Sequence, residues 1–461
     1  DLLSHDVVSW NALMSGYAKH GKGEEALVCL KQMESEGIRP NIVTFICSLK
    51  ACGIVGDADE GRLLNAEIAR KGLLDKHCFV GNALVDMYAK CGLLAMAEEV
   101  FDSLLDQGVI SWNSLITGYV KHGCCKEALN CFEEMRLDLV TPNSVTFVCI
   151  LKSCSILGDV EKGREIHAMI ERSGLMTDSI VGNALVDMYA SCGIFEKARE
   201  VFDTLLVQDV VAWTILITKY ARYGKYDDGL ACFEEMKSKG VSPNSVILIC
   251  SLNACCTLGA IERAEEIHAE IIRLGCLGND IAVGNALIDM YANCGDLAKA
   301  QDVFDKLPCR DVISWTTLIT GYTKHEYNEQ ALNCFEKMQQ EGISPDGITF
   351  VCTLKACGSA GVIENGIKIH DEIIRKGLLE GDVVVGNALI DMYVNCGMLS
   401  KAKEVLNQLP LQDLVSWTTL IAGYVKHGLN IEALDCFEEM LCKRVSPDAV
   451  TVVYSLQACG N

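Results

Sequence analysis

The stretch Val7–Lys19, VVSWNALMSGYAK, decides the fold, because its tryptophan phrase VSWN returns four more times along the chain as ISWN, VAWT, ISWT and VSWT. The five tryptophans are spaced by 102, 101, 102 and 102 residues, and they are Trp10, Trp112, Trp213, Trp315 and Trp417. Self-similarity at a fixed period indicates a repeat array, in which each unit buries its apolar face against its neighbours.

Two further phrases subdivide this period. One is FICSLKAC and its relatives FVCILKSC, LICSLNAC and FVCTLKAC; the other is VGNALVDMYAKCG with three near copies. Cutting at equivalent residues gives units of 35, then 35 or 36, then 31 residues, called here Trp units, middle units and short units. The Trp units are 7–41, 109–143, 210–244, 312–346 and 414–448. The middle units are 42–77, 144–178, 245–280 and 347–382, and the short units are 78–108, 179–209, 281–311 and 383–413. Partial units occupy 1–6 and 449–461.

Within a unit the apolar residues have helical spacing. Leu13, Met14 and Tyr17 recur at three- and four-residue steps, a glycine pair interrupts the run, and the same spacing then resumes. Gly37 is placed as a helix stop, and Asn41 suits the cap of the next helix. The pattern predicts an all-α fold, a right-handed superhelical solenoid of helix-turn-helix repeats that runs as one domain over 1–461.

Composition narrows the class of protein. Among the 461 residues no apolar run has the length of a membrane span, so we expect no membrane partner. The 25 cysteines mostly recur at fixed repeat positions and no CxxC pair occurs, which predicts small buried helix residues rather than zinc ligands, and no metal or other cofactor. This many free thiols favours a reducing compartment.

The two ends of the chain cut through repeats. Residues 1–6, DLLSHD, match the tail of a short unit, and the chain stops thirteen residues into a middle unit. No basic targeting segment precedes the array. We therefore expect this chain to be the central portion of a longer protein.

The three phrases, with the alternation of unit lengths, closely resemble pentatricopeptide repeat (PPR) proteins of the PLS subclass, the plant organelle RNA-editing factors. The Trp, middle and short units correspond to the P, L and S repeats of that subclass. The resemblance implies sequence-specific binding of single-stranded RNA, one nucleotide per repeat, in a mitochondrion or chloroplast. It also implies that deaminase chemistry comes from a domain outside this chain or from another protein, and that accessory editing proteins contact the L units.

The resemblance further implies that the fifth and last residues of P and S units read the bases. In the Trp units these are Asn11 with Asn41, Asn113 with Asn143, Thr214 with Asn244, Thr316 with Asp346, and Thr418 with Asp448. In the short units they are Asn82 with Gly108, Asn183 with Asp209, Asn285 with Asp311, and Asn387 with Asp413. The alternative interpretation of the last residues is helix capping, which is compatible with reading.

A chemical argument supports such a code. A carboxylate only accepts hydrogen bonds and so suits guanine or uracil, whose pairing-edge ring nitrogen carries a proton, whereas an amide also donates and suits adenine or cytosine. In the family, threonine at the fifth position selects purines and asparagine selects pyrimidines. The predicted target is 5′-YNNYNUANUGNUG-3′, with cytosine favoured at both Y positions. Gly108 lacks an acceptor, so the base at its unit stays unassigned.

Other recurring residues have two interpretations each. Val8, Ile110, Val211, Ile313 and Val415 either sandwich the bases, as in the family, or pack in the core. The tryptophans two residues later are expected to pack between helices. The fifth residues of the middle units, Ile46, Val148, Ile249 and Val351, are apolar and cannot read a base edge, so we expect spacers or surfaces for partner proteins.

Charge argues against nucleic acid, since 40 Lys and Arg against 62 Asp and Glu leave a net charge of −22. The distribution of charged residues over the surface can still produce a local basic region despite the negative net charge. A basic residue recurs in the first helices of the Trp units, at Lys19, Lys121, Arg222, Lys324 and Lys426, and middle units add Lys50, Lys152 and Lys355. We expect an inner basic ladder that contacts phosphates, inside an acidic coat; ordinary solvated lysines are the alternative.

Two further functions are open on the sequence. A zinc deaminase carries HxE followed by PCxxC, and His268 with Glu270 and His370 with Glu372 supply only the first half, at a repeat position where His167 also stands. We expect no enzyme in this chain. One alternative is an RNA-binding factor that acts in RNA stabilisation, splicing or translation without editing. Another is a helical scaffold that binds peptides instead of RNA.

Overall fold

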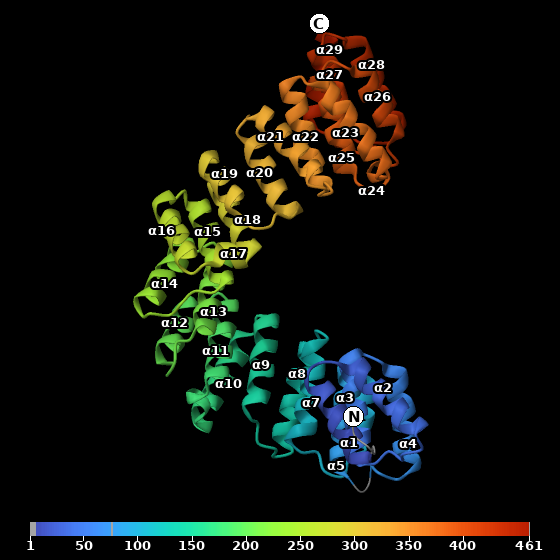
Figure 1. The fold of residues 1–461 in the computed structure, drawn as a ribbon, viewed down its shortest axis with the longest axis vertical. Coiled ribbons are helices and arrows are strands. Elements are labelled where there is room, and N and C mark those ends of the chain that lie inside the picture. Colours follow the sequence, from blue (N-terminus) through green and yellow to red (C-terminus); the bar gives the residue numbers. More distant parts are fainter. Residues whose placement is uncertain (1–5, 75–76, 461) are drawn as a thin grey trace. The chain divides into compact units, whose positions relative to one another are not determined.

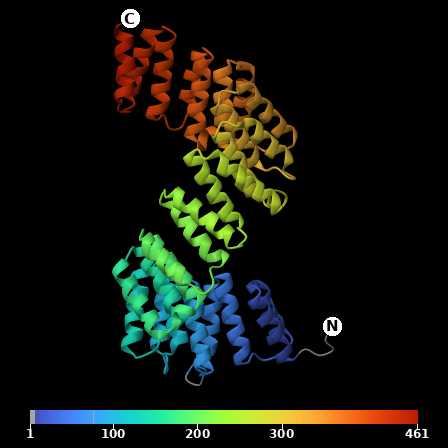
Figure 2. The same cartoon turned by 90° about the vertical axis from the view of Figure 1, so that its left-hand side faces the viewer.

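The computed structural model describes residues 6–74 and 77–460, and every regular element within those ranges is a helix (Figure 1). All but residue 6 of the partial unit predicted at 1–6 lies outside them. Apart from the unit at 210–244, each whole unit forms two neighbouring antiparallel helices joined by a short turn (Figure 2). The predicted all-α architecture of helix pairs is confirmed.

In the Trp units the first helices are α1 (Val7–Lys19), α7 (Val109–Lys121), α13 (Val210–Arg222), α20 (Val312–Lys324) and α27 (Leu414–Lys426). Their second helices are α2 (Gly23–Ser35), α8 (Cys125–Leu137), α14 (Tyr226–Ser238), α21 (Asn328–Gln340) and α28 (Asn430–Cys442).

The middle units begin with α3 (Ile42–Val55), α9 (Ser144–Leu157), α15 (Ser245–Leu258) and α22 (Gly347–Ala360), and the last partial unit with α29 (Ala449–Gly460). Their second helices are α4 (Ala58–Arg70), α10 (Val160–Ser173), α16 (Ile261–Arg273) and α23 (Ile363–Arg375). Short helical turns that the sequence pattern does not predict follow three of them: η1 (Leu175–Thr177), α17 (Cys276–Asn279) and α24 (Leu378–Gly381).

The short units consist of the first helices α5 (Cys78–Lys90), α11 (Ser179–Ser191), α18 (Ile281–Asn293) and α25 (Val383–Asn395). Their second helices are α6 (Leu94–Asp102), α12 (Phe195–Thr204), α19 (Leu297–Lys306) and α26 (Leu399–Gln408).

Polar caps and glycines set the helix ends. Asn41 precedes α3, and its side-chain oxygen accepts a hydrogen bond from the Thr44 N–H at 3.0 Å. Gly56 ends the same helix with φ 82°, a left-handed conformation that favours glycine. Helix α2 ends at Ser35, just before the predicted stop Gly37, which has φ 77°. The predicted capping by the last residues of the Trp units is therefore confirmed.

Tryptophans and glycines occupy equivalent positions in the stacked first helices. All five tryptophans are at most 6% exposed, and Trp112 meets Phe101 edge to face with ring centroids 4.5 Å apart. The predicted structural role of the tryptophans is confirmed. At the matching position of a short unit, a Cβ on Gly81 would lie 2.3 Å from Leu104 Cδ2, so a larger residue there would require the leucine side chain to move.

The helices form two layers within each of two compact units. One compact unit is Asp1–Gly224 with Ser238–Val241, and the other is Lys225–Lys237 with Ser242–Asn461. Inside each, first helices pack on the first helices of neighbouring repeats, as α1 does on α3 and α20 on α22. Second helices pack on the first helix of the next repeat, as α2 does on α3 and α21 on α22. That the whole chain behaves as one domain stays a prediction.

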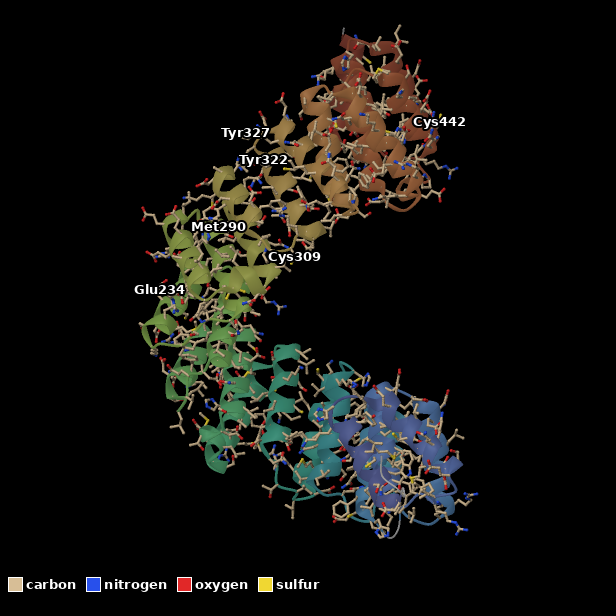
Figure 3. The ribbon with its side chains drawn as sticks, in the orientation of Figure 1. Glu234, Met290, Cys309, Tyr322, Tyr327 and Cys442 are labelled. Carbon is tan, nitrogen blue, oxygen red and sulfur yellow. The ribbon has the colours of Figure 1, made fainter. Side chains whose placement is uncertain are left out.

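The cysteines depart in part from the predicted burial. Cys52, Cys154, Cys255 and Cys357 are buried, and burial raises the pKa of the Cys52 thiol to about 12. The C-cap residues of the short units' first helices are half-buried cysteines, namely Cys91, Cys192, Cys294 and Cys396. Figure 3 labels Cys309 and Cys442, both exposed, and Cys459 near the chain end is exposed too. The prediction of burial at recurring positions was wrong for Cys459, whereas it is confirmed at Cys131, Cys232, Cys334 and Cys436.

Candidate nucleic-acid interface

One face of each first helix carries the side chains that the sequence singles out. In α20 these are Ile313, Thr316, Thr320 and Lys324, at steps of three, four and four residues, which place them on one side of an α-helix. The corresponding positions in a middle unit are Val43, Ile46 and Lys50. Each compact unit therefore presents a layer in which predicted base-sandwiching, base-reading and basic residues share a face.

The aliphatic residues at the second position are exposed. Val8, Ile110, Val211, Ile313 and Val415 are 67, 57, 53, 56 and 55% exposed, so the core-packing interpretation is wrong. Sequence reasoning missed that the other units repeat this feature, although the recurrence was visible. The exposed residues there are Val43, Val145, Val246, Ile348 and Val450 in the middle units, and Phe79, Ile180 and Val384 in the short units.

In the first two Trp units the predicted reading pair is joined by a hydrogen bond. Asn11 Nδ2 donates to Asn41 Oδ1 at 3.0 Å, and Asn113 Nδ2 donates to Asn143 Oδ1 at the same distance. A third residue completes each group: Thr44 Oγ1 donates to Asn11 Oδ1 at 2.7 Å and lies 3.1 Å from Asn41 Oδ1. Both carbonyl oxygens thus accept hydrogen bonds within the group, and the N–H hydrogens that are not used between the two amides remain as donors.

In the fourth Trp unit the arrangement has the opposite chemical character. Thr316 Oγ1 lies 2.6 Å from Thr349 Oγ1, which donates to Asp346 Oδ1 at 2.7 Å. Because the Thr349 proton is used on the carboxylate, the Thr316 proton is the one shared between the two hydroxyls. Thr316 then offers only oxygen lone pairs, and so does the second oxygen of Asp346.

The fifth Trp unit repeats this geometry. Thr418 Oγ1 lies 2.7 Å from Thr451 Oγ1, and Thr451 donates to Asp448 Oδ1 at 2.7 Å. Hydrogen bonds from the Thr451 N–H and hydroxyl hold the pKa of Asp448 below its ordinary value. The carboxylate is therefore ionised near neutral pH and acts as an acceptor.

The short units pair an amide donor with a carboxylate acceptor. Asn285 Nδ2 lies 3.3 Å from Asp311 Oδ1, and Asn387 Nδ2 lies 3.3 and 3.2 Å from the two oxygens of Asp413. Burial opposes ionisation of Asp311, but hydrogen bonds from Ser314 and Asn285 outweigh it and lower its pKa. Since the carbonyl oxygen of Asn285 is buried, this pair presents one donor and one acceptor.

Two predicted pairs do not form such a group. Gly108 has no side chain to meet Asn82. Asp209 accepts from the Ala212 N–H at 2.9 Å, and among the described residues no hydrogen bond joins it to Asn183. Thr214 donates to the Val210 carbonyl of its own helix at 2.6 Å, while Asn244 caps α15 through the Ile247 N–H at 3.0 Å.

The predicted basic ladder consists of exposed residues that also connect repeats. Each one in the Trp units is the last residue of its first helix, where a cation interacts favourably with the helix dipole. Lys324 Nζ donates to Asn293 Oδ1 at 2.8 Å, and Lys426 Nζ donates to Asn395 Oδ1 at 3.1 Å. Lys121 Nζ donates to the Lys90 carbonyl at 3.2 Å. These bonds orient the ammonium groups on the layer of first helices.

Sequence reasoning missed a carboxylate on the same face of every short unit. These residues recur in the phrase VDMY or IDMY, and they are Asp86, Asp187, Asp289 and Asp391. Asp86 pairs with Lys90 at 2.7 Å and Asp187 with Lys219 at 2.9 Å. Burial raises the pKa of Asp391, against the nearby Lys426 and Lys355. The ladder is therefore of mixed charge rather than wholly basic.

Two hollows lie on the layer of first helices. One of about 360 Å³ is lined by Ser15, Lys19, Cys47, Lys50 and Lys90 from α1, α3 and α5. The other, of about 500 Å³, includes Thr418, Lys426 and Val450 from α27 and α29. A predicted reading residue, a predicted basic residue and an exposed second-position residue thus line the second hollow together.

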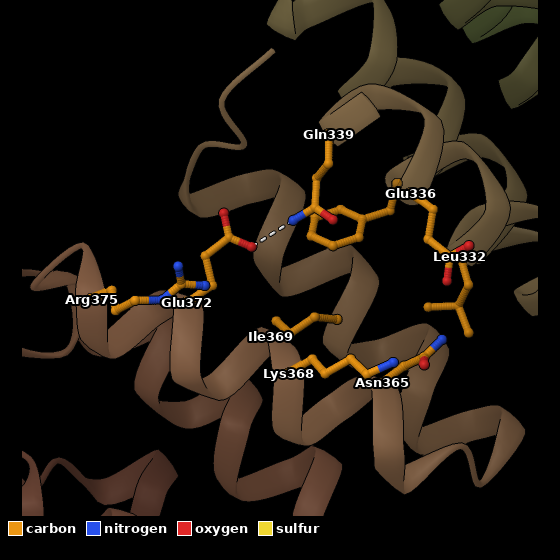
Figure 4. A pocket seen from close by; sticks show the side chains of 9 residues that line it. Leu332, Glu336, Gln339, Asn365, Lys368, Ile369, Glu372 and Arg375 are labelled. Atoms are coloured by element: carbon orange, nitrogen blue, oxygen red, sulfur yellow. Dashed lines mark hydrogen bonds between the residues drawn. The ribbon is translucent and has the colours of Figure 1, made fainter. Parts of the chain in front are cut away.

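A third hollow, of about 190 Å³, lies between the second helices α21 and α23 (Figure 4). Its wall combines Leu332 and Ile369 with charged residues, and Gln339 Nε2 donates to Glu372 there at 2.6 Å. No residue predicted to read a base lines it.

A histidine in each of the last three whole middle units lies within hydrogen-bond distance of a tyrosine hydroxyl in the next unit. Nδ1 of His167, His268 and His370 lies 3.0, 2.9 and 2.8 Å from the hydroxyls of Tyr189, Tyr291 and Tyr393. Glu270 pairs with Arg273 at 2.8 Å, not with His268. Over the described residues, no three His, Cys, Asp or Glu side chains are grouped as a metal site. Nor is any described helix both long and apolar enough to cross a bilayer.

Comparison with known proteins identifies the repeats. The sequence model described as the PPR repeat family matches residues 5–53, 107–155, 208–256, 310–359 and 412–461, which is more than half of the chain. The chain belongs to the PPR repeat family. A second model, described as PPR repeat, matches the short units at 82–109, 183–210, 285–312 and 387–412.

This PPR protein is similar to pentatricopeptide repeat-containing proteins of Arabidopsis thaliana. A chloroplastic relative is 34% identical over 458 residues, which are 99% of this chain and 52% of the relative. Another chloroplastic relative is 33% identical, with 99% of this chain and 73% of the relative covered. A mitochondrial one is 31% identical, with 99% and 66% covered. The chain thus spans about half to three quarters of the length of these relatives.

Solved structures share the fold. The crystal structure of the pentatricopeptide repeat protein PPR10 from maize is 18% identical, with a TM-score of 0.62, and the alignment covers 99% of this chain and 72% of that one. A structure of PPR10 in complex with an 18-nt psaJ RNA element is 16% identical, with a TM-score of 0.54 and coverage of 99% and 82%. At these identities the likeness establishes the PPR solenoid fold.

Proposed function

We propose that this PPR protein binds single-stranded RNA in a sequence-specific manner, one nucleotide per repeat, along the layer of first helices. The observation that carries the proposal is that the paired fifth and last residues present three different hydrogen-bonding sets. The RNA complex of the structurally similar PPR10 supports RNA as the partner. Exposed aliphatic residues at the second positions supply surfaces on which bases can stack.

The hydrogen-bonding sets match three different bases. Asn11 with Asn41 offers only donors, which suits the adjacent acceptors N3 and O2 of cytosine. Thr316 with Asp346 offers only acceptors, which suits the N1–H and N2–H donors of guanine. Asn285 with Asp311 offers one of each, which suits the N3–H and a carbonyl of uracil. These sets support the first, fourth, ninth, tenth, twelfth and thirteenth bases of the expected target 5′-YNNYNUANUGNUG-3′. Uracil at the sixth base and adenine at the seventh rest on the family resemblance.

The finer assignment is that the chain is the recognition tract of an organellar C-to-U editing factor of the PLS subclass, with a single solenoid over 1–461. The alternation of Trp, middle and short units supports the subclass. The chloroplastic and mitochondrial relatives support an organelle. The deaminase acts in cis or in trans, and accessory editing proteins contact the middle units.

A substitution of one reading residue tests the proposal. Replacing Thr316 by Asn, with Asp346 kept, converts the fourth Trp unit to the pair found in short units. We expect the preference at the tenth base to move from guanine to uracil by roughly tenfold, since one good base contact contributes about 1–3 kcal/mol. The measurement is titration of four oligonucleotides that differ only at that base. An unchanged preference would show that this pair does not read RNA.

A further inference from the structure

A threonine at the third position of the middle units contacts both predicted reading residues of the preceding Trp unit. Thr44, Thr146, Thr349 and Thr451 are fully buried. Thr146 Oγ1, for example, donates to Asn113 Oδ1 at 2.6 Å and lies 3.1 Å from Asn143 Oδ1. The same bridging position recurs at four of the five boundaries between a Trp unit and the unit after it.

Helix capping alone does not account for these contacts. A capping box needs only the bonds between the cap residue and the third residue of the helix, such as the Asn41 N–H to Thr44 Oγ1 bond at 3.1 Å. Ser314 stands at the same position in a Trp unit, and its hydroxyl bonds Asp311 and does not bond Asn285. The reach back to the fifth residue of the preceding repeat is thus specific to the middle units.

One boundary lacks this threonine. Ile247 occupies the position in the third middle unit, and an isoleucine side chain has no hydroxyl. In the preceding Trp unit, Thr214 donates to the Val210 carbonyl of its own helix at 2.6 Å. A fifth-position threonine hydroxyl can therefore donate to the backbone of its own helix.

We infer that the third residue of a middle unit is a positioning residue for base selection, which sets the orientation and the donor or acceptor character of the fifth residue before it. This inference rests on the proposed RNA-reading function. At Asn11 and Asn113 the threonine hydroxyl donates to the carbonyl oxygen, which directs the amide nitrogen to the last residue of the unit and leaves one N–H hydrogen as a donor. At Thr316 and Thr418 the middle-unit threonine accepts a hydrogen bond from the fifth-residue hydroxyl, so the oxygen of that fifth residue is left as an acceptor.

Thr349→Val removes the hydroxyl and keeps the branched shape. Thr316 then loses the partner of its proton and either turns to its own helix, as Thr214 does, or donates to a uracil carbonyl. In both cases we expect the preference for guanine over uracil at the tenth base to fall about three- to tenfold, the size of one hydrogen bond. The preference for guanine over adenine stays, because the Asp346 carboxylate still rejects the adenine ring nitrogen. Thr349→Ser keeps the hydroxyl and the wild-type ratios.

The readout is the ratio of dissociation constants for oligonucleotides with guanine, uracil or adenine at the tenth base, alongside thermal unfolding of each variant. A purely structural role would weaken all three ligands equally, and that result overturns the inference, as does an unchanged ratio of guanine to uracil. If Thr349→Val fails to fold, Thr451→Val in α29 gives the same test at the thirteenth base. A wild-type protein without base preference would overturn the proposed function, whereas loss of this effect alone overturns only the positioning role.

Discussion

At the scale of the residue, hydrogen bonds inside the fold decide what a side chain can offer to a ligand. An isolated asparagine both donates and accepts, but Asn11 accepts from Thr44 and donates to Asn41, which leaves one N–H hydrogen as its remaining donor. An isolated threonine also does both, but Thr316 has its proton shared with Thr349. The chemical code therefore belongs to groups of three residues rather than to two residue names.

The histidines of the middle units predict a dependence of stability on pH. Burial lowers the pKa of His167, His268 and His370, with Glu171 opposing it at His167. A depressed pKa means that the folded state favours the neutral ring, so this stability is full above the unfolded pKa of about 6.5 and is lost as the pH falls below it. We expect the melting temperature to fall between roughly pH 7 and pH 5.

The chain contains its own control for this effect. Asn65 occupies the equivalent position in the first middle unit and donates to the Tyr88 hydroxyl at 3.0 Å. A triple variant with His167→Asn, His268→Asn and His370→Asn should keep the tyrosine contacts and lose part of the acid sensitivity. Equal losses of melting temperature in the wild type and the variant would contradict the assignment.

At the scale of the element, helix ends without glycine are points of strain. Leu139 follows α8 with φ 58° and is 89% exposed, where the other Trp units have Gly37, Gly240 and Gly342 or, in the last one, Arg444. A left-handed backbone costs a residue with a side chain about 1–2 kcal/mol. We expect Leu139→Gly to raise the free energy of unfolding by roughly 0.5–1 kcal/mol after the entropy of the glycine is counted.

The matched control lies two residues earlier. Leu137 is the last residue of α8 and is 80% exposed, so Leu137→Gly loses a similar exposed side chain from a right-handed position. This variant should lower the free energy of unfolding by about 1 kcal/mol. Chemical denaturation of both variants measures the difference, and a loss of stability in Leu139→Gly would refute the strain argument.

The helix pairs could be predicted because each element repeats its local signals. Three signals agree on where helices begin and end. They are the period of the tryptophan phrase, the three- and four-residue spacing of apolar residues, and the cap and stop residues such as Asn41 and Gly37. The short turns after the middle units, such as η1 and α24, could not be predicted, since no periodicity exists in three or four residues. Exposure of the second positions also required the structure, because hydrophobicity alone predicts burial equally well.

The paired residues of the candidate site could be predicted, but the residues that contact these pairs could not. The pairs such as Thr316 with Asp346 came from the family resemblance, while the bridging Thr349 and the facing Asp391 did not. Both residues recur at fixed positions in the sequence, so a signal was present. Their roles depend on contacts between residues that are distant along the chain, and these contacts follow from repeat stacking rather than from local pattern.

At the scale of the whole molecule, the net charge of −22 is compatible with RNA binding through its distribution. Acidic phrases lie on second helices, such as Glu133 and Glu134 in α8, whereas Lys50, Lys324 and Lys426 lie on first helices. The carboxylates of the short units reduce this separation, and two of them are neutralised by Lys90 and Lys219. We therefore expect affinity to depend on base contacts and stacking more than on phosphate neutralisation.

Selection of ligands from a pool of random RNA tests the central claim most directly. If paired side chains on the first helices read successive bases, the selected molecules will share uracil at the sixth, ninth and twelfth positions and guanine at the tenth and thirteenth. Positions that face the middle units will be unconstrained. Selected RNA without a consensus, or with a consensus that ignores this three-base spacing, would contradict the account.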